Sequence, residues 1–282
     1  MSDPARDGFG RERRAGRGRL SRAAFLALIA LLYAFLIAPI LIVVIASLNA
    51  GRFLVFPPDG LSFQWYVNFA NSGPFVRSFF FSLRLAALTT AVATVIGTAA
   101  ALYVVRHASR NDLLRMLLVA PLQLPGIMTA LALLIFYYAI GLGGTSYLGL
   151  LLGHVLVCTP YVFLTVSAVL YNFDHSLEEA ARSLGAGRLT TFGRITLPII
   201  KGGIISGAVL AFITSFDQFP ISLLLSGVGT TTLPIQVFDY LRFSFDPTVA
   251  AVGTISILIT LGVVIVTERL GGLESLYWGS RQ

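Results

Sequence analysis

Charged residues are scarce in this sequence of 282 residues: Asp, Glu, Lys and Arg make up 12% of it, about half the share found in an ordinary soluble domain. Hydrophobic residues make up 56%. Several apolar runs approach or exceed the roughly 20 residues with which a helix crosses a bilayer. Too little polar sequence remains to cover these runs as core helices of a soluble fold. The composition therefore predicts an all-α, polytopic membrane protein.

Cysteine, lysine and histidine are also rare. The single cysteine, Cys158, excludes an intrachain disulfide, and its apolar surroundings favour a packing role. The single lysine, Lys201, is preceded by Ile200 and followed by Gly202, so the chain lacks the glycine-lysine-serine/threonine sequence with which a P-loop binds phosphates. Three histidines and one cysteine form no metal-binding spacing or nucleophile constellation. We therefore expect no enzyme activity, no bound ATP and no other cofactor in this chain.

The apolar runs predict six membrane-spanning helices, at residues 23–48, 85–105, 116–140, 147–170, 202–225 and 248–267. Pro121 and Pro125 lie in the third run and Pro160 lies in the fourth, so kinks are expected there. Together the six helices form a transmembrane domain of residues 23–270.

The basic residues predict the orientation. Of the 20 Lys and Arg residues, all fall on one side of a six-span topology except Arg52, Arg77, Arg84 and Arg242. The positive-inside rule then places both termini on the cytoplasmic side. The segment 1–22, rich in arginine and glycine, is expected to be disordered, and residues 271–282 form a cytoplasmic tail. Because topology explains the net charge of +7, the charge indicates membrane lipid and no nucleic acid as a partner.

One polar segment, residues 174–200, interrupts the apolar sequence between the fourth and fifth spans. Ser176 followed three residues later by Glu179 predicts a capping box that begins a short helix. An apolar stripe at helical spacing follows, made of Leu177, Ala180, Ala181 and Leu184.

The same segment contains turn and cap signals for a second short helix. Gly185 stands where a helix C-terminus favours a left-handed residue. Thr190 or Thr191 can cap the second helix, and Pro198 is expected to end it before the fifth span. Helices this short are marginal in water, so they need to pack on their own bundle or on a partner protein. An ordinary connecting loop and a helix lying on the lipid surface are the alternatives.

The segment resembles the EAA loop of bacterial ABC importer permeases. The pattern E-A-A-x3-G-x9-I-x-L-P is matched by Glu179, Ala180, Ala181, Gly185, Ile195, Leu197 and Pro198. The resemblance covers nearly the whole chain after residue 22. It implies a six-helix permease of the ABC type I importer kind, without ATPase activity of its own. In that family the loop, which here includes Leu184, is the coupling helix that docks on a cytoplasmic ATPase subunit.

The detailed sequence is similar to the second permease of spermidine/putrescine-type systems. The similar stretches are RFLVFPPDGLSFQWYVNF (52–69), SFDQFPISLLLSG (215–227) and TTTLPIQVFDYLRFSFDPTVAAV (230–252). This resemblance implies a location in the bacterial inner membrane and the import of a polyamine or related amine. It also implies a second homologous permease and two ATPase subunits that bind ATP and Mg. A periplasmic solute-binding protein would dock on the outer loops, residues 49–77 and 227–247.

Asp217 is the one carboxylate well inside a predicted span, where an acid is costly unless it faces the bundle or a wet cavity. With Ser215, Phe216 and Gln218 it is predicted to line the substrate pathway. The alternatives are a hydrogen bond within the bundle, for example with Ser215 or Thr214, and ordinary packing for Phe216. His154, in the fourth span, is interpreted as a packing histidine.

The solute is left open by one departure from the family. Polyamine permeases of this type often carry two adjacent acids where this chain has Asp217 and Gln218. The same architecture importing a monoamine, a zwitterion, an opine or a phosphonate therefore stays possible. An ion-coupled secondary transporter is a further alternative, but it needs intramembrane ion ligands and repeated broken helices. One acid and no visible repeat argue against it.

Overall fold

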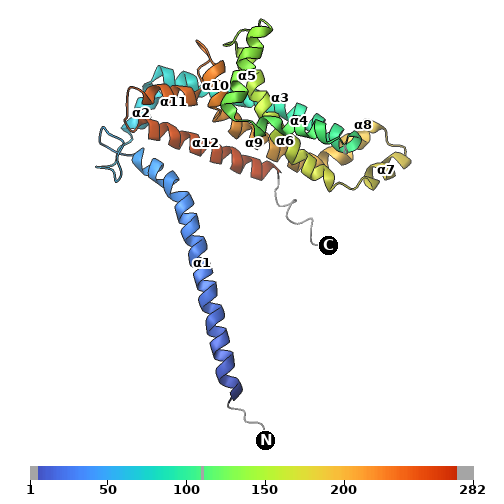
Figure 1. Cartoon of the computed structure of the whole chain (residues 1–282), viewed down its shortest axis with the longest axis horizontal. Coiled ribbons are helices and arrows are strands. Elements are labelled where there is room, and N and C mark those ends of the chain that lie inside the picture. Colours follow the sequence, from blue (N-terminus) through green and yellow to red (C-terminus); the bar gives the residue numbers. More distant parts are fainter. Residues whose placement is uncertain (1–5, 109–110, 272–282) are drawn as a thin grey trace. The chain divides into compact units, whose positions relative to one another are not determined.

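The computed structural model describes residues 6–108 and 111–271, and the secondary structure of this part of the chain consists of helices, joined by loops, and one isolated antiparallel bridge between Asn49 and Leu61 (Figure 1). The elements are, in chain order, α1 (Arg6–Ala46), α2 (Gln64–Asn71), α3 (Gly73–His107), α4 (Asp112–Gln123), α5 (Gly126–Ala139), α6 (Tyr147–Tyr171), α7 (Ser176–Ser183), α8 (Arg188–Thr191), the π-helical turn η1 (Phe192–Thr196), α9 (Leu197–Phe216), α10 (Pro220–Leu225), α11 (Leu233–Leu241) and α12 (Thr248–Gly271). The predicted all-α class is confirmed.

Five helical stretches of the described residues are long and apolar enough to cross a membrane: Phe25–Ala46, Gly73–His107, Tyr147–Tyr171, Arg188–Phe216 and Thr248–Arg269. The pair α4 and α5, bent by 107°, makes a sixth crossing if it counts as one span.

The bend between α4 and α5 lies at Leu124 and Pro125. A proline disfavours the helical conformation in the residue before it, and Leu124 is extended, with φ −85° and ψ 143°. The predicted kink at Pro125 is therefore a full break. Pro121 and Pro160 lie inside α4 and α6, which continue through them.

Two predicted segments differ in the structure. Residues 6–22 belong to α1 and are helical where disorder was expected, because extending a helix from an adjacent apolar span is far less costly than starting one. Residues 1–5 and 272–282 lie outside the described residues. The fifth predicted span, 202–225, is not one helix: α9 ends at Phe216 and α10 begins at Pro220. Proline has no N–H with which to continue a helix, but it fits well at the first turn of a new one.

The described residues form two compact units. The smaller unit comprises the chain up to Tyr66 and Asp246–Thr254. Its loop after α1 is organised by Asn49, which is fully buried. The Asn49 side-chain oxygen accepts hydrogen bonds from the N–H groups of Gly51 and Asp59, at 3.1 and 3.0 Å. The Trp65 indole donates to the Asn49 carbonyl at 2.6 Å. This predicted outer loop is therefore an ordered structure.

The larger unit comprises Val67–Phe245 and the chain from Ile255 onward. In it α3, α6 and α9 pack on one another around buried side chains of α6, among them Val162, Phe163 and Val166. Gly207 of α9 lies directly against α6, since a Cβ there would come 2.7 Å from the Val162 Cα. Small residues allow such close approach between membrane helices. The three helices thus form the frame that carries α7 and α8 at one end (Figure 1).

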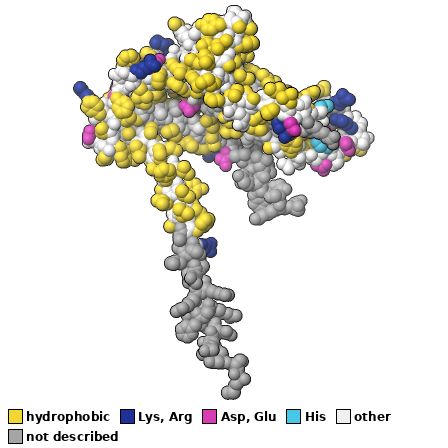
Figure 2. Space-filling model, viewed as in Figure 1, with side chains coloured by type: hydrophobic (Ala, Val, Ile, Leu, Met, Phe, Trp, Pro, Cys, Tyr) yellow, Lys and Arg dark blue, Asp and Glu magenta, His cyan; other side chains and the backbone are white. Residues whose placement is uncertain are grey.

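Charged side chains are unevenly distributed over the visible surface. Hydrophobic side chains cover most of the helices in Figure 2, whereas Lys, Arg, Asp, Glu and His side chains are seen at the end where α7 and α8 lie, and further charged side chains are seen at the opposite end, near α11. Such a distribution fits helices surrounded by lipid that end in water.

Candidate functional site

The polar segment between α6 and α9 folds into the two short helices α7 and α8. The two sides of α7 have opposite environments. Glu178 is 7% exposed, whereas Leu177 and Leu184 of the predicted stripe are 46% and 89% exposed. Ala180 is exposed and Ala181 is half-buried. The described part of the chain therefore leaves the apolar stripe uncovered. The side of α7 that packs against the rest of the chain carries the charged residue Glu178.

The start of α7 differs from the predicted capping box. Ser176 is the first residue of α7 and not its N-cap, and the N-cap position, His175, makes no side-chain cap bond. The Asp174 carboxylate accepts a hydrogen bond from the Ser176 N–H at 2.9 Å. Hydrogen bonds from the Ser176 side chain and N–H lower the pKa of Asp174. The capping box is wrong because an aspartate two residues earlier satisfies the first N–H group, and Glu179 is left exposed.

The end of α7 is as predicted. Gly185 has a φ of +87°, and its N–H donates to the Arg182 carbonyl at 2.9 Å. The Ala186 N–H donates to the Ala181 carbonyl at 3.0 Å. These two bonds define a Schellman motif, which satisfies the last carbonyl groups of the helix. A Cβ at Gly185 would meet nothing within 4 Å, so the backbone angle is what requires glycine.

The second short helix is not capped by threonine. α8 begins at Arg188 with Gly187 at its N-cap, and Thr190 and Thr191 lie at its end. The Thr191 hydroxyl donates back to the Gly187 carbonyl at 3.1 Å. The predicted threonine cap is wrong, because both threonines lie inside the helix.

Pro198 does not interrupt the chain before the fifth span. α8, η1 and α9 continue into one another over Arg188–Phe216, and Pro198 occupies the first turn of α9. In η1, which contains Ile195, the Leu197 N–H donates to the carbonyl of Phe192, five residues earlier. A π-helical turn of this kind absorbs a local irregularity without ending the helix. The predicted break at Pro198 is therefore wrong.

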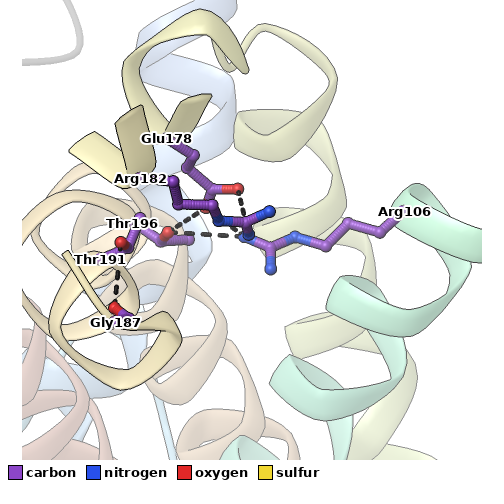
Figure 3. A network of polar contacts seen from close by, with 6 residues as sticks. All are labelled: Arg106, Glu178, Arg182, Gly187, Thr191 and Thr196. Atoms are coloured by element: carbon purple, nitrogen blue, oxygen red, sulfur yellow. Dashed lines mark hydrogen bonds and ion pairs between the residues drawn. The ribbon is translucent and has the colours of Figure 1, made fainter. Parts of the chain in front are cut away.

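A network of polar side chains holds the buried face of α7 (Figure 3). Arg106 Nη2, in the last turn of α3, donates to Glu178 Oε1 at 2.5 Å. The Thr196 hydroxyl, at the end of η1, donates to the same oxygen. Arg182 Nη2 lies 3.9 Å from Glu178 Oε2. We call Arg106, Glu178 and Thr196 the Glu178 network; Arg182, whose contact is longer and whose side chain is half-exposed, lies beside it.

The Glu178 network is the main feature that the sequence did not predict. Its local signal is the spacing of Glu178 and Arg182, four residues apart and outside the apolar stripe. Arg106 and Thr196 are 72 and 18 residues from Glu178 along the chain. No local pattern connects residues at such separations.

A pocket of about 560 Å³ lies beside the Glu178 network. Its lining is mainly polar and comes from the end of α3 and from α7, α8 and η1: Val105, Arg106, His107, His175, Glu178, Glu179, Arg182, Arg188, Thr191 and Phe192. The exposed stripe of α7 and this pocket form one accessible end of the larger unit.

Asp217 lies at the C-cap of α9, and its side chain is exposed. The predicted position well inside a helical span is therefore corrected to a helix end. Among residues 6–108 and 111–271, no hydrogen bond or ion pair reaches the Asp217 carboxylate. The predicted alternative, a bond to Ser215, is not present, because the Ser215 hydroxyl faces His154.

The other predicted pathway residues divide into two groups. Gln218, next to Asp217, is half-buried in the break between α9 and α10. Ser215 and Phe216 are 3% and 4% exposed, and Phe216 packs edge-on against Phe79, at 6.3 Å between ring centroids. Ser215 and Phe216 are therefore packed within this chain. Asp217 and Gln218 lie at the break between α9 and α10.

His154 connects the two helices on either side of this break. Its side chain is fully buried in α6. Nδ1 lies 2.9 Å from the Ser215 hydroxyl of α9, and Nε2 lies 3.1 Å from the Ser222 hydroxyl of α10. Both ring nitrogens therefore have partners, which confirms a satisfied, packed histidine. The contacts hold the end of α9 and the start of α10 against α6.

The helical arrangement is that of ABC importer permeases. A chain of the bacterial alginate ABC transporter, in complex with alginate pentasaccharide-bound periplasmic protein, superposes with a TM-score of 0.69 at 18% identity, covering 92% of this chain and 96% of that one. A chain of the MetNI methionine ABC transporter superposes with a TM-score of 0.60 at 18% identity, covering 71% of this chain and 97% of that one. The fold defines the class: an all-helical, multi-pass membrane protein with the architecture of a chain of these ABC transporters.

Sequence comparisons identify the family. Residues 93–271 match the family described as "Binding-protein-dependent transport system inner membrane component". The putrescine transport system permease protein PotI of Escherichia coli (strain K12) is 38% identical, over 82% of this chain and 84% of its own. The spermidine/putrescine transport system permease protein PotC of Haemophilus influenzae is 32% identical, over 84% of this chain and 92% of its own. The chain belongs to this family of inner membrane transport components.

Proposed function

We propose that this chain is a permease subunit of an ATP-driven importer in a bacterial inner membrane, and that its solute is a polyamine or a related amine. The observation that carries the proposal is the structure of α7. Its one buried charged residue, Glu178, is anchored within the chain, while Leu177 and Leu184 are exposed. An uncovered apolar stripe on a helix of eight residues is suited to burial against a partner protein.

The proposed partners at α7 are two cytoplasmic ATPase subunits, of which one docks on this chain. The site consists of Glu179, Ala180, Ala181, Leu184 and Gly185, followed by Ile195, Leu197 and Pro198. The lack of a P-loop supports this division of labour, because the only lysine, Lys201, is followed by glycine. ATP and Mg would therefore bind the partner. Docking from the cytoplasm also agrees with the orientation that the basic residues predict, with both termini inside.

The proposed solute is supported by Asp217. An exposed carboxylate without a partner in the described chain can accept hydrogen bonds from an ammonium group, and such charge-assisted bonds are strong. The relatives named above are a putrescine and a spermidine/putrescine permease. Gln218 next to Asp217 supplies an amide where a second carboxylate would suit a polycation better, so an opine, phosphonate or other small solute is the alternative.

The remaining proposed partners are a second homologous permease and a periplasmic solute-binding protein. Large side chains on the membrane helices, such as Val95 and Ile135, are 70% and 62% exposed, so lipid or a second permease must cover them. The binding protein would dock on the outer loops. The loop organised by Asn49 exposes the aromatic side chains of Phe53 and Phe63, at 73% and 72%.

Transport by the isolated complex tests the function. The complex is purified through a tag on this chain, reconstituted into proteoliposomes with its binding protein, and supplied with radiolabelled putrescine or spermidine. We expect the solute to accumulate only when ATP is present on the side of the membrane where α7 lies. Vanadate is expected to abolish this accumulation. Accumulation driven by a proton or sodium gradient without ATP would mean an ion-coupled transporter. Uptake of an opine or phosphonate, but of neither amine, would refute the polyamine assignment.

A further inference from the structure

We infer that Glu178 is a positioning residue for transport: through Arg106 and Thr196 it makes α7 move as one body with α3 and α9. The inference rests on the proposed docking of an ATPase on α7. It adds a specific route by which movement of the ATPase reaches the membrane helices, and it assigns that route to residues outside the E-A-A pattern.

α7 is weakly held apart from the Glu178 network. It has eight residues, too few for a stable helix in isolation. Leu177, its one large apolar side chain, and Leu184 at its C-cap are exposed. It is flanked by the turn at Asp174 and His175 and by the glycine turn at Gly185. A force on the exposed stripe could therefore tilt α7 about these turns unless the buried face resists it.

The Glu178 network supplies that resistance, because one carboxylate oxygen joins three elements. Glu178 Oε1 accepts from Arg106 at the end of α3 and from Thr196 directly before α9. Arg106 Nη2 also lies 3.4 Å from the Thr196 hydroxyl. With Glu178 only 7% exposed, leaving its carboxylate without these donors is costly. The three elements are therefore expected to stay together when α7 is displaced.

One of the two anchored helices, α9, leads toward the predicted substrate pathway. α9 runs without a break for 20 residues from Leu197 to Phe216, a length of about 30 Å at 1.5 Å per residue. Asp217 follows directly at its C-cap. Displacement of Thr196 together with α7 would thus move the start of a rigid helix whose far end carries the unpartnered carboxylate.

The test compares variants that keep or remove single contacts in the complete, reconstituted complex. Glu178→Gln removes the charge, and Thr196→Val removes the hydroxyl with little change of shape. We expect both to keep the ATPase subunits bound, since the exposed stripe is intact. Uptake per ATP hydrolysed should fall about fivefold or more, the lower end of a typical allosteric coupling. Thr196→Ser keeps the hydroxyl and should retain the wild-type ratio.

Two outcomes would overturn the inference. One is a wild-type ratio of uptake to ATP hydrolysis in Glu178→Gln and Thr196→Val. The other is an equal fall in the matched control Arg182→Gln, which removes only the 3.9 Å contact of a half-exposed side chain and should have little effect. An equal fall would assign the defect to lost charge on α7 and not to the joined elements. The amount of complex that can be purified distinguishes a reduced ratio of uptake to ATP hydrolysis from misfolding, because misfolding lowers uptake and hydrolysis together.

A cross-linking control separates this inference from the proposed function. Leu184→Cys in a Cys158→Ala background is expected to cross-link to a cysteine introduced on the docking surface of the ATPase subunit, both in the wild-type sequence and in Glu178→Gln. Absence of the cross-link in both would refute docking on α7 itself. Loss of the cross-link in Glu178→Gln alone would contradict the inference, because the network would then maintain docking and not transmission.

Discussion

Two carboxylates illustrate how differently single acids are used in this chain. Glu178 is buried and accepts hydrogen bonds from Arg106 and Thr196. Its carboxylate therefore attaches α7 to the neighbouring helices. Asp217 is exposed at the end of α9, and no donor within the described residues reaches it. An exposed acid at the end of a membrane-spanning helix, without a partner in the described chain, is suited to meet water, the second permease or the solute.

The first prediction at the residue scale concerns Asp217→Asn. The change keeps size and hydrogen bonding but removes the negative charge. Uptake of putrescine is expected to fall about tenfold or more, because a hydrogen bond to a charged group contributes about 1.5–3 kcal/mol and 1.4 kcal/mol is a factor of ten. The loss should be larger for spermidine, which carries more charge. Initial uptake rates in proteoliposomes measure both.

The control for this change is Asp112→Asn, which removes the same charge from the first turn of α4 and should leave uptake unchanged. Wild-type transport by a stable Asp217→Asn complex would refute the assignment of Asp217 to the pathway. A loss of complex in the membrane, in place of a loss of rate, would indicate a structural role.

At the scale of elements, two breaks in the helical chain determine which side chains are exposed to partners or solute. The break between α9 and α10 exposes Asp217 and is held by His154, which contacts a serine on each side. The glycine turn after α7 exposes Leu184. Both breaks arise from residues with special backbones: Pro220 cannot continue α9, and Gly185 adopts a left-handed angle.

The prediction at this scale concerns Gly185→Val. At a φ of +87°, a side chain is expected to cost about 1 kcal/mol or more, and a β-branched one more than that. The turn would open and Leu184 would be displaced, while the membrane helices would still insert. We expect less ATPase to co-purify with the variant and uptake to be lost, as measured on equal amounts of membrane-inserted protein.

Gly187→Val is the matched control for Gly185→Val. It adds the same side chain two residues later, where φ is −68° and a Cβ would meet nothing within 4 Å. It should assemble and transport normally. Full uptake by a well-expressed Gly185→Val variant, or equal loss in both variants, would contradict a role for the left-handed turn.

At the scale of the whole molecule, orientation in the membrane is the property on which docking depends. The basic residues predict that α7 and α8 lie in the cytoplasm and that the loop between α10 and α11 lies on the opposite side. Arg188 is exposed in the first of these regions, and Val228 is fully exposed in the second.

Cysteine labelling measures this orientation. In a Cys158→Ala background, Val228→Cys is expected to react with a membrane-impermeant maleimide in intact spheroplasts, whereas Arg188→Cys should react only after the membrane is opened. Val228 is preferred to the neighbouring Gly229, whose φ of +84° disfavours a side chain. Labelling at position 188 from outside would end the proposal that α7 docks on a cytoplasmic ATPase.

The sequence by itself determined the features that depend on local energies. Hydropathy over about 20 residues located the five helices that are long enough to cross a membrane and the bent pair α4 and α5, because burial of each run in lipid depends on its own composition. The conformations of Gly185 and Pro125 followed from the backbone limits of glycine and proline. The E-A-A pattern predicted which segment is the coupling segment, and the single lysine, Lys201, is not in a P-loop sequence. Each of these features depends only on residues that are close together in the sequence.

Only the tertiary structure decided which groups those elements bury and where the elements stop. Glu178, and not Glu179, is the anchored acid of α7, because Arg106, 72 residues away, ends α3 beside it. Asp217 is at a helix end and not within one, and Ser215 bonds to His154 instead of to Asp217. A buried polar group must find its donors wherever the packing of α3, α6 and α9 brings them, and that packing is a property of the folded chain as a whole.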